Sequence, residues 1–262
     1  LRGIQPAHAR IMFKMAMGFL VVVVPLQIIA GHEHGANVYE HQPAKLAAME
    51  GHWETWDGNA PLVLLGMPNE QTEQNDYALE IPDIGSWIVT GSFDGRIRGL
   101  KEWPAEERPP VAIVFWSFRI MVGIGLLMLF IGYVGAFLLW RTDITRHTLF
   151  LRLCFLSGPL GFVAVITGWI TAEVGRQPYT VYGLLRTVDS VSPVTAEAVG
   201  TSLIVFVFVY AIVFTAGSYY LFKLAWAGPE QGEAPPPQRP KLATWMAPEE
   251  SATSPAAPRA GG

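Results

Sequence analysis

The sequence has few charged residues, no basic surplus and one cysteine. Of its 262 residues, 15% are charged and 51% are hydrophobic, whereas soluble domains carry about 25% charged residues. This deficit argues against an ordinary soluble enzyme and against a disordered chain. The formal net charge is −4, so no nucleic-acid partner is expected. The lone Cys154 excludes a disulfide scaffold and a thiolate metal cluster built from this chain.

The hydrophobic residues are concentrated in four long stretches. Each is near or above the roughly 20 residues that cross a hydrocarbon core, and each must be helical because lipid offers backbone groups no partner. The sequence therefore predicts an all-α integral membrane protein with four transmembrane helices and a large outer, periplasmic loop between the first and the second. The predicted helices are 11–30, 111–140, 149–172 and 201–226.

Lysine and arginine set the predicted orientation, since they gather on the cytoplasmic side of a membrane. They cluster around the start of the first helix, between the second and third helices, and after the fourth. Both termini are therefore expected in the cytoplasm, with a cytoplasmic start at 1–10, a cytoplasmic loop at 141–148 and a disordered tail at 227–262. The outer loops are then 31–110, which holds 14 acidic and 5 basic residues, and 173–200.

Ionisable residues within a membrane helix are costly and indicate function. Arg119 lies about 12 Å into the second helix at ~1.5 Å per residue, two residues before Met121, whose thioether is a possible haem ligand. The outer end of the third helix carries Trp169, and the residues just beyond it include Glu173 and Arg176. An interfacial tryptophan with a surface ion pair explains those three equally well. In the predicted orientation all five residues lie toward the outer face, which favours a functional site.

No histidine falls inside the predicted helices. A low-spin haem needs two axial ligands, so this chain is not expected to supply a histidine–methionine pair alone. His32 and His34 resemble a short metal-binding tract, but no cysteine or carboxylate pattern completes it. The loop histidines, among them His52, are better interpreted as exposed or hydrogen-bonded side chains.

Four separated motifs resemble subunit I of cytochrome bd-type quinol oxidases. Residues 45–50 read Lys-Leu-Ala-Ala-Met-Glu, 115–123 read Phe-Trp-Ser-Phe-Arg-Ile-Met-Val-Gly, and 175–178 read Gly-Arg-Gln-Pro. Residues 182–187, Tyr-Gly-Leu-Leu-Arg-Thr, resemble the cyanide-insensitive branch of the family. The motifs occur in the family's order and on the predicted side of the membrane, and the loop resembles the family's short type of quinol-oxidising loop, or Q-loop.

The resemblance implies roles for individual residues. Lys45 and Glu50 match the quinol-oxidising residues of the Q-loop, Met121 matches an axial ligand of haem b558, and Arg119 matches an arginine that stabilises that haem. Residues two apart on a helix differ by about 200°. Arg119 and Met121 therefore cannot both point at one face of the same haem: either Arg119 reaches around, or it faces another haem.

The third helix matches the family at its outer end. The resemblance implies that Glu173 is the carboxylate at the iron of haem b595, that Trp169 lies between haems and that Arg176 sits beside them. Tyr179 stands where the family usually has tryptophan. An aromatic ring is kept at the interface, so an adjusted rather than a lost function is expected.

The resemblance also implies the whole activity. Quinol is oxidised at the outer face of a bacterial inner membrane, and electrons pass through haems b558 and b595 to haem d, or to a third haem b, which reduces oxygen. The family's earlier helices, with their histidine ligands, are not in the sequence. The expected partners are therefore the N-terminal half of subunit I, subunit II, a small accessory subunit and quinol, and the fragment alone is expected to be inactive. The alternatives are a non-catalytic scaffold or assembly subunit, or a remnant of a split oxidase gene; a transporter is disfavoured because no inverted repeat is visible.

Overall fold

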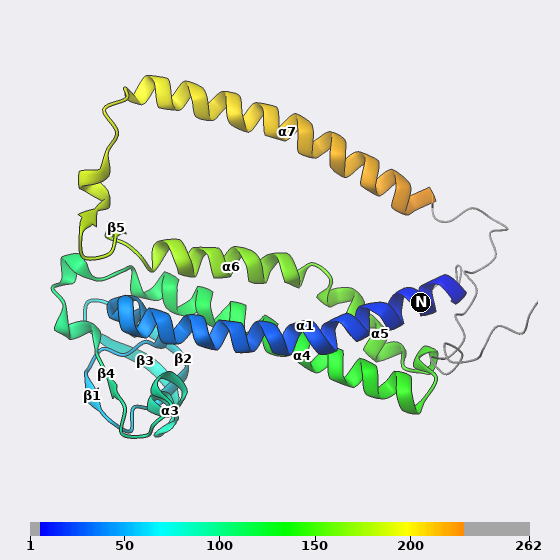
Figure 1. Cartoon of the computed structure of the whole chain (residues 1–262), viewed down its shortest axis with the longest axis horizontal. Helices are drawn as coiled ribbons and strands as arrows, with labels where there is room; N and C mark the ends of the chain where they lie inside the picture. The colour runs from blue at the N-terminus through cyan, green and yellow to red at the C-terminus, as the bar shows by residue number, and fades with distance from the viewer. Residues whose placement is uncertain (1–5, 228–262) are drawn as a thin grey trace, which may run out of the picture. The chain divides into compact units, whose positions relative to one another are not determined.

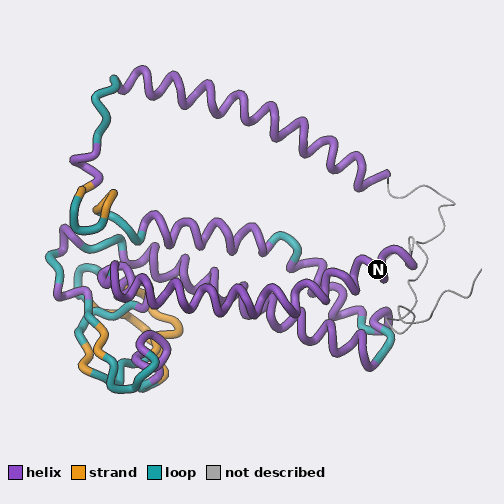
Figure 2. Tube along the Cα trace, in the orientation of Figure 1, coloured by secondary structure: helices purple, strands orange, loops and turns teal. Residues whose placement is uncertain are grey.

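The computed structural model describes residues 6–227. Its helices and strands are shown in Figures 1 and 2. Residues 6–196 form one compact unit, and the second unit contains α7 (Ala196–Ala227). The predicted tail at 227–262 and the first half of the predicted start at 1–10 lie outside the described residues, apart from Ala227.

Within residues 6–227 four helices are long and apolar enough to cross a membrane, which confirms the mostly helical membrane fold with four spans. They are α1 (Pro6–His41), α4 (Val111–Arg141), the pair α5 (Thr148–Ser157) and α6 (Leu160–Val174), and α7. Two of these helices differ most from the predicted spans. The first helix continues to His41, because 31–41 holds no residue that must end a helix. The third is broken at Gly158 and Pro159, where proline lacks the N–H that a continuous helix needs.

The segment between α1 and α4 contains strands that the hydrophobic pattern did not predict. It begins with α2 (Pro43–Glu50) and includes α3 (Ile84–Thr90). Strand β2 (Leu62–Asn69) pairs antiparallel with β3 (Gln74–Ile81), and β1 (Trp56–Asp57) pairs with β4 (Arg96–Ile97). A third pair, β5 (Tyr179–Val181) and β6 (Leu185–Arg186), follows α6. We call residues 42–110 the outer segment, after the side of the membrane on which the charge pattern predicts them.

Helices α1, α4 and α6 lie side by side (Figure 1), with α4 packed against both of the others. Glycines allow part of this close approach. A Cβ at Gly135 would lie 2.3 Å from Sδ of Met17, and one at Gly132 would lie 3.1 Å from the Leu20 side chain, so both positions bring α4 against α1. At Gly123 and Gly125, by contrast, a Cβ would meet no atom within 4 Å. Those two glycines leave space beside α4 rather than packing helices of this chain together.

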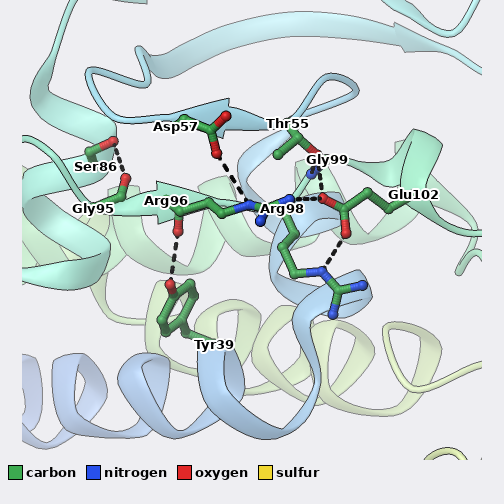
Figure 3. A network of polar contacts seen from close by, with 9 residues as sticks. All are labelled: Tyr39, Thr55, Asp57, Ser86, Gly95, Arg96, Arg98, Gly99 and Glu102. Carbon is green, nitrogen blue, oxygen red and sulfur yellow. Dashed lines mark hydrogen bonds and ion pairs between the residues drawn. The ribbon is translucent and has the colours of Figure 1, made fainter.

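Polar contacts tie the outer segment to itself and to α1 (Figure 3). The Glu102 carboxylate accepts hydrogen bonds from Thr55 Oγ1 at 2.6 Å, from Arg98 Nε at 2.5 Å and from Arg96 at 3.2 Å. Tyr39 on α1 donates to the carbonyl of Arg96 at 2.8 Å. The outer segment is thus anchored to the end of α1 on which His41 lies. A second anchor joins it to α4, whose first N–H, on Val111, donates to Glu70 at 2.9 Å.

Candidate functional site

The short helix α2 is buried between the larger helices, and Arg119 of α4 holds its C-terminal end. An arginine has five N–H donors, and each donor on Arg119 has a backbone carbonyl as its acceptor. Nε donates to the carbonyl of Leu64 at 3.0 Å. Nη1 donates to the carbonyls of Met49 at 2.6 Å and Phe115 at 3.3 Å. Nη2 donates to the backbone carbonyl of Glu50 at 3.3 Å and to that of Val63. One side chain therefore joins the last turn of α2 and the start of β2 to α4. We call this arrangement the Arg119 clamp.

The local sequence explains why α2 ends where the clamp binds. The last carbonyls of a helix lack intrahelical partners and carry partial negative charge, so a guanidinium there satisfies and stabilises them. Gly51 follows with φ of 76°, and its N–H bonds back to the carbonyl of Ala47. A Cβ on Gly51 would lie 2.6 Å from the Phe115 ring, over which the Arg119 guanidinium lies at 3.3 Å from the ring centroid. Gly51 and Phe115 thus belong to the clamp, although neither residue had a predicted role of its own.

Lys45 points from α2 toward the end of α6. Its side chain is 7% exposed, and Nζ donates to the carbonyl of Ala172 at 3.2 Å. A Cβ on Gly175 would lie 3.0 Å from Cγ of Lys45, so a glycine in the Gly-Arg-Gln-Pro motif makes room for the lysine stem. Burial and the nearby Arg176 guanidinium lower the pKa of Lys45, while Glu173 opposes them. The structure therefore brings the 45–50 and 175–178 motifs together.

Glu50 lies at the clamp. It is 7% exposed, burial raises the pKa of its carboxyl, and the positive charge of Arg119 opposes that increase. Positions five apart on a helix differ by about 140° at 100° per residue. Lys45 accordingly faces α6, while Glu50 lies near Arg119. The two quinol-oxidising candidates flank α2 on different sides rather than forming a direct pair.

Arg119 and Met121 face different neighbours. Phe115 and Arg119 are four apart and share the face of α4 that meets α2. Ser117 and Met121 share the other face: Ser117 Oγ lies 2.9 Å from Thr171 Oγ1 of α6, and a Cβ at Gly168 of α6 would lie 2.8 Å from Sδ of Met121. The angular conflict noted in the sequence is thereby explained, because Arg119 holds the outer segment while Met121 lies against α6.

The remaining candidates lie at the end of α6. Trp169 is 66% exposed, and Glu173 forms an ion pair with Arg176. The Arg176 Nε is buried and has no hydrogen-bond partner in the described part of the chain. The exposed indole of Trp169 and the unpartnered Nε of Arg176 could both contact a further group bound against α6.

These residues can be tested against the haems that the resemblance implies. Met121 offers a thioether, Trp169 an uncovered aromatic face, Glu173 a carboxylate and Arg176 an unused donor for an anionic haem propionate. They fit haem groups. Arg119 fits less well, because its five donors already serve carbonyls. Among residues 6–227 no group of three or more His, Cys, Asp or Glu side chains could hold a metal ion, and His32 and His34 lie on α1 rather than in a loop.

His52 differs from the expectation for a loop histidine. It is 3% exposed, its Nε2 has no hydrogen-bond partner among the described residues, and burial together with Arg119 lowers its pKa to about 4. No periodicity or motif marked it. The signal that was present is its position two residues after Glu50, in a segment that must turn sharply at Gly51.

Comparison with known proteins places the chain in a family. The family described as cytochrome bd terminal oxidase subunit I matches residues 1–229. Cytochrome bd ubiquinol oxidase subunit 1 of Bacillus subtilis (strain 168) is 35% identical over 195 residues, which cover 71% of this chain and 42% of that protein. Cytochrome bd-II ubiquinol oxidase subunit 1 of Escherichia coli (strain K12) is 29% identical over an aligned length of 289 residues. The alignment covers 85% of this chain and 56% of that protein.

A solved structure agrees with these relatives. The bd oxidase from Geobacillus thermodenitrificans matches with a TM-score of 0.76 and 30% identity over 87% of this chain and 52% of that one. The chain spans about half the length of the proteins that it matches. The family match and the four apolar helices confirm the resemblance drawn from the motifs: the chain belongs to the cytochrome bd terminal oxidase subunit I family.

Proposed function

We propose that the chain forms the quinol-oxidising and haem-facing part of a terminal respiratory quinol oxidase in a bacterial inner membrane. The observation that carries the proposal is the buried α2 helix, which places Lys45 against the end of α6 and Glu50 beside the Arg119 clamp. The relatives are named ubiquinol oxidase subunits. The outer segment faces the periplasm in this proposal, and both termini lie in the cytoplasm.

The residues on α2 have the chemistry that quinol oxidation needs. Quinol loses two electrons and two protons as it becomes quinone. A carboxylate whose pKa is raised by burial accepts a proton more readily than an exposed one, which suits Glu50. Lys45 donates a hydrogen bond from a fixed position and orients a quinol oxygen.

The haem-facing residues lie on α4 and α6. In the proposal Met121 would hold the iron of haem b558, Glu173 would hold the iron of haem b595, Trp169 would contact the haems, and Arg176 would neutralise a propionate. The haems, including haem d or a third haem b, supply the acceptors that carry the electrons to oxygen. Arg119 is proposed as a positioning residue for α2. The remaining part of subunit I, subunit II and a small accessory subunit complete the assembly.

Lys45→Ala and Glu50→Gln test the proposal in the assembled oxidase. Each is expected to lower quinol oxidation at least about tenfold, since positioned proton transfer typically contributes 10²–10⁴-fold, while haem content stays normal. Glu106→Gln is the matched control, because Glu106 is an exposed carboxylate of the outer segment that has no part in the proposed site. Unchanged turnover in both α2 variants, as a non-catalytic scaffold would show, contradicts the proposal.

The pH profile gives a second prediction. Glu50 must be ionised to accept a proton, and its ionised fraction falls as the pH decreases through a pKa above the usual 4.5. Quinol oxidation is therefore expected to decline on the acid side at a pH above that ordinary value. In Glu50→Gln the residual activity should lack this acid limb. An unchanged limb in the variant would assign the titration to another group.

A further inference from the structure

His52 combines a fixed backbone with an unused ring nitrogen. The backbone N–H of His52 donates to the carbonyl of Ala47 at 2.9 Å. The backbone carbonyl of His52 accepts from the N–H of Leu100 at 2.9 Å, so both backbone groups are held. The ring is buried, yet Nε2 has no partner among the described residues. Buried polar side-chain atoms are nearly always hydrogen-bonded to protein or water. An orphan atom two residues from Glu50 therefore needs a reason.

The surroundings keep the imidazole neutral. Burial disfavours the charged ring, and the Arg119 guanidinium repels a second positive charge. A neutral imidazole has one N–H donor and one acceptor nitrogen. It can take a proton on one nitrogen while the other nitrogen releases its own, and it then carries the same charge as before. This chemistry suits transfer of a proton better than storage of one.

A pocket of about 270 Å³ adjoins His52 on the side of the β2–β3 hairpin. Since a water occupies ~30 Å³ of liquid, the pocket has room for several. Three carboxylates line it, those of Glu54, Glu73 and Glu80, and Glu54 and Glu80 are exposed to solvent. The pocket thus joins the buried histidine to the surface of the outer segment through groups that accept protons.

Asn75 braces the wall between His52 and the hairpin. It accepts a hydrogen bond from Trp53 Nε1 at 3.0 Å and donates to the carbonyl of Gly51 at 2.8 Å. The residues before and after His52 are therefore both fixed to β3. Such bracing holds the ring at the pocket and explains why the imidazole does not turn out into solvent.

We propose that His52 relays protons from the quinol-oxidising residues on α2 to the carboxylate-lined pocket and so to the outer surface. The proposal rests on the proposed function. In each oxidation quinol gives two electrons to the haems and two protons to the protein. A proton received from Glu50 binds one nitrogen of His52, and the proton on the other nitrogen leaves to water in the pocket. No bond forms between His52 and quinol.

The test uses His52→Ala and His52→Gln in the assembled oxidase. Both are expected to slow quinol oxidation about tenfold and to enlarge its solvent deuterium isotope effect, while haem content and oxidation of an artificial electron donor, ascorbate with a phenylenediamine mediator, stay unchanged. Added imidazole should restore turnover in His52→Ala. His41→Ala is the control, since the His41 side chain is 64% exposed. The glutamine variant, which keeps most of the side-chain volume, carries the test if the alanine variant does not assemble.

The outcomes separate the two proposals. Unchanged turnover in the His52 variants, with turnover lost in Glu50→Gln, overturns the relay and leaves the quinol site intact. Slow turnover with a normal isotope effect and no rescue by imidazole also overturns it, since that is the behaviour of a merely structural residue. Unchanged turnover in Glu50→Gln overturns the proposed function itself.

Discussion

Arg119→Leu is expected to abolish quinol oxidation, with a loss of 100-fold or more. The substitution removes five hydrogen bonds to carbonyls of α2, β2 and α4, and a buried polar group left without a partner costs about 1–3 kcal/mol. A total of several kcal/mol exceeds the roughly 2.8 kcal/mol that corresponds to a factor of 100. The measurements are quinol turnover and amide hydrogen exchange in residues 42–64, where exchange should accelerate.

The controls for the Arg119 clamp use charge and position. Arg119→Lys keeps the positive charge but offers three donors rather than five, so an intermediate loss is expected. Arg98→Leu removes an exposed arginine of the outer segment, which pairs with Glu102. Exposed ion pairs contribute about 1 kcal/mol or less to stability. A fast-turnover Arg119→Leu enzyme with normal exchange would show that the clamp does not hold α2.

Gly51→Val is expected to damage the site through backbone strain and through a collision with Phe115. Gly51 has φ of 76°, where residues with a Cβ cost roughly 1–2 kcal/mol, and the new Cβ would press on Phe115 at 2.6 Å. Phe115 supports the Arg119 guanidinium, so both strain and clash act on the clamp. Quinol turnover should fall about tenfold or more, and limited proteolysis should cut the outer segment faster.

Gly91→Val is the matched control for that experiment. Gly91 also follows a short helix, α3, with φ of 74°, but a Cβ there would meet no atom within 4 Å. It carries the backbone strain without the collision. Equal losses in the two variants would mean that backbone conformation alone matters and that contact with Phe115 does not.

Much of the membrane part could be predicted from the sequence. Apolar runs of sufficient length have few alternatives in lipid, so the four helices were recovered, and α4 was placed within a residue of its end. The unusual residues Arg119, Met121, Glu173 and Arg176 stood out because charge and thioether are rare against such a background. Their motif resemblance to the family was confirmed.

The outer segment could not be predicted in the same way. Strand β3 is largely exposed, and the buried positions of β2, Val63 and Gly66, are three residues apart, so neither strand shows the regular alternation that identifies a half-buried strand. The clamp depends on the backbone carbonyl groups of Met49, Val63 and Leu64. The side chains at these positions do not indicate that their backbone carbonyls accept hydrogen bonds from a distant arginine. His52 is buried by tertiary packing against the hairpin, which no local pattern shows.

Rapid mixing of quinol with the oxidised, oxygen-free enzyme tests most directly whether α2 is the site of electron entry. We expect the Glu50→Gln enzyme to show haem reduction by quinol at least about tenfold slower than the wild type and the Glu106→Gln control, while dithionite reduces all three enzymes fully. Haem reduction at the same rate in Glu50→Gln and the wild type would contradict the assignment of quinol oxidation to this helix.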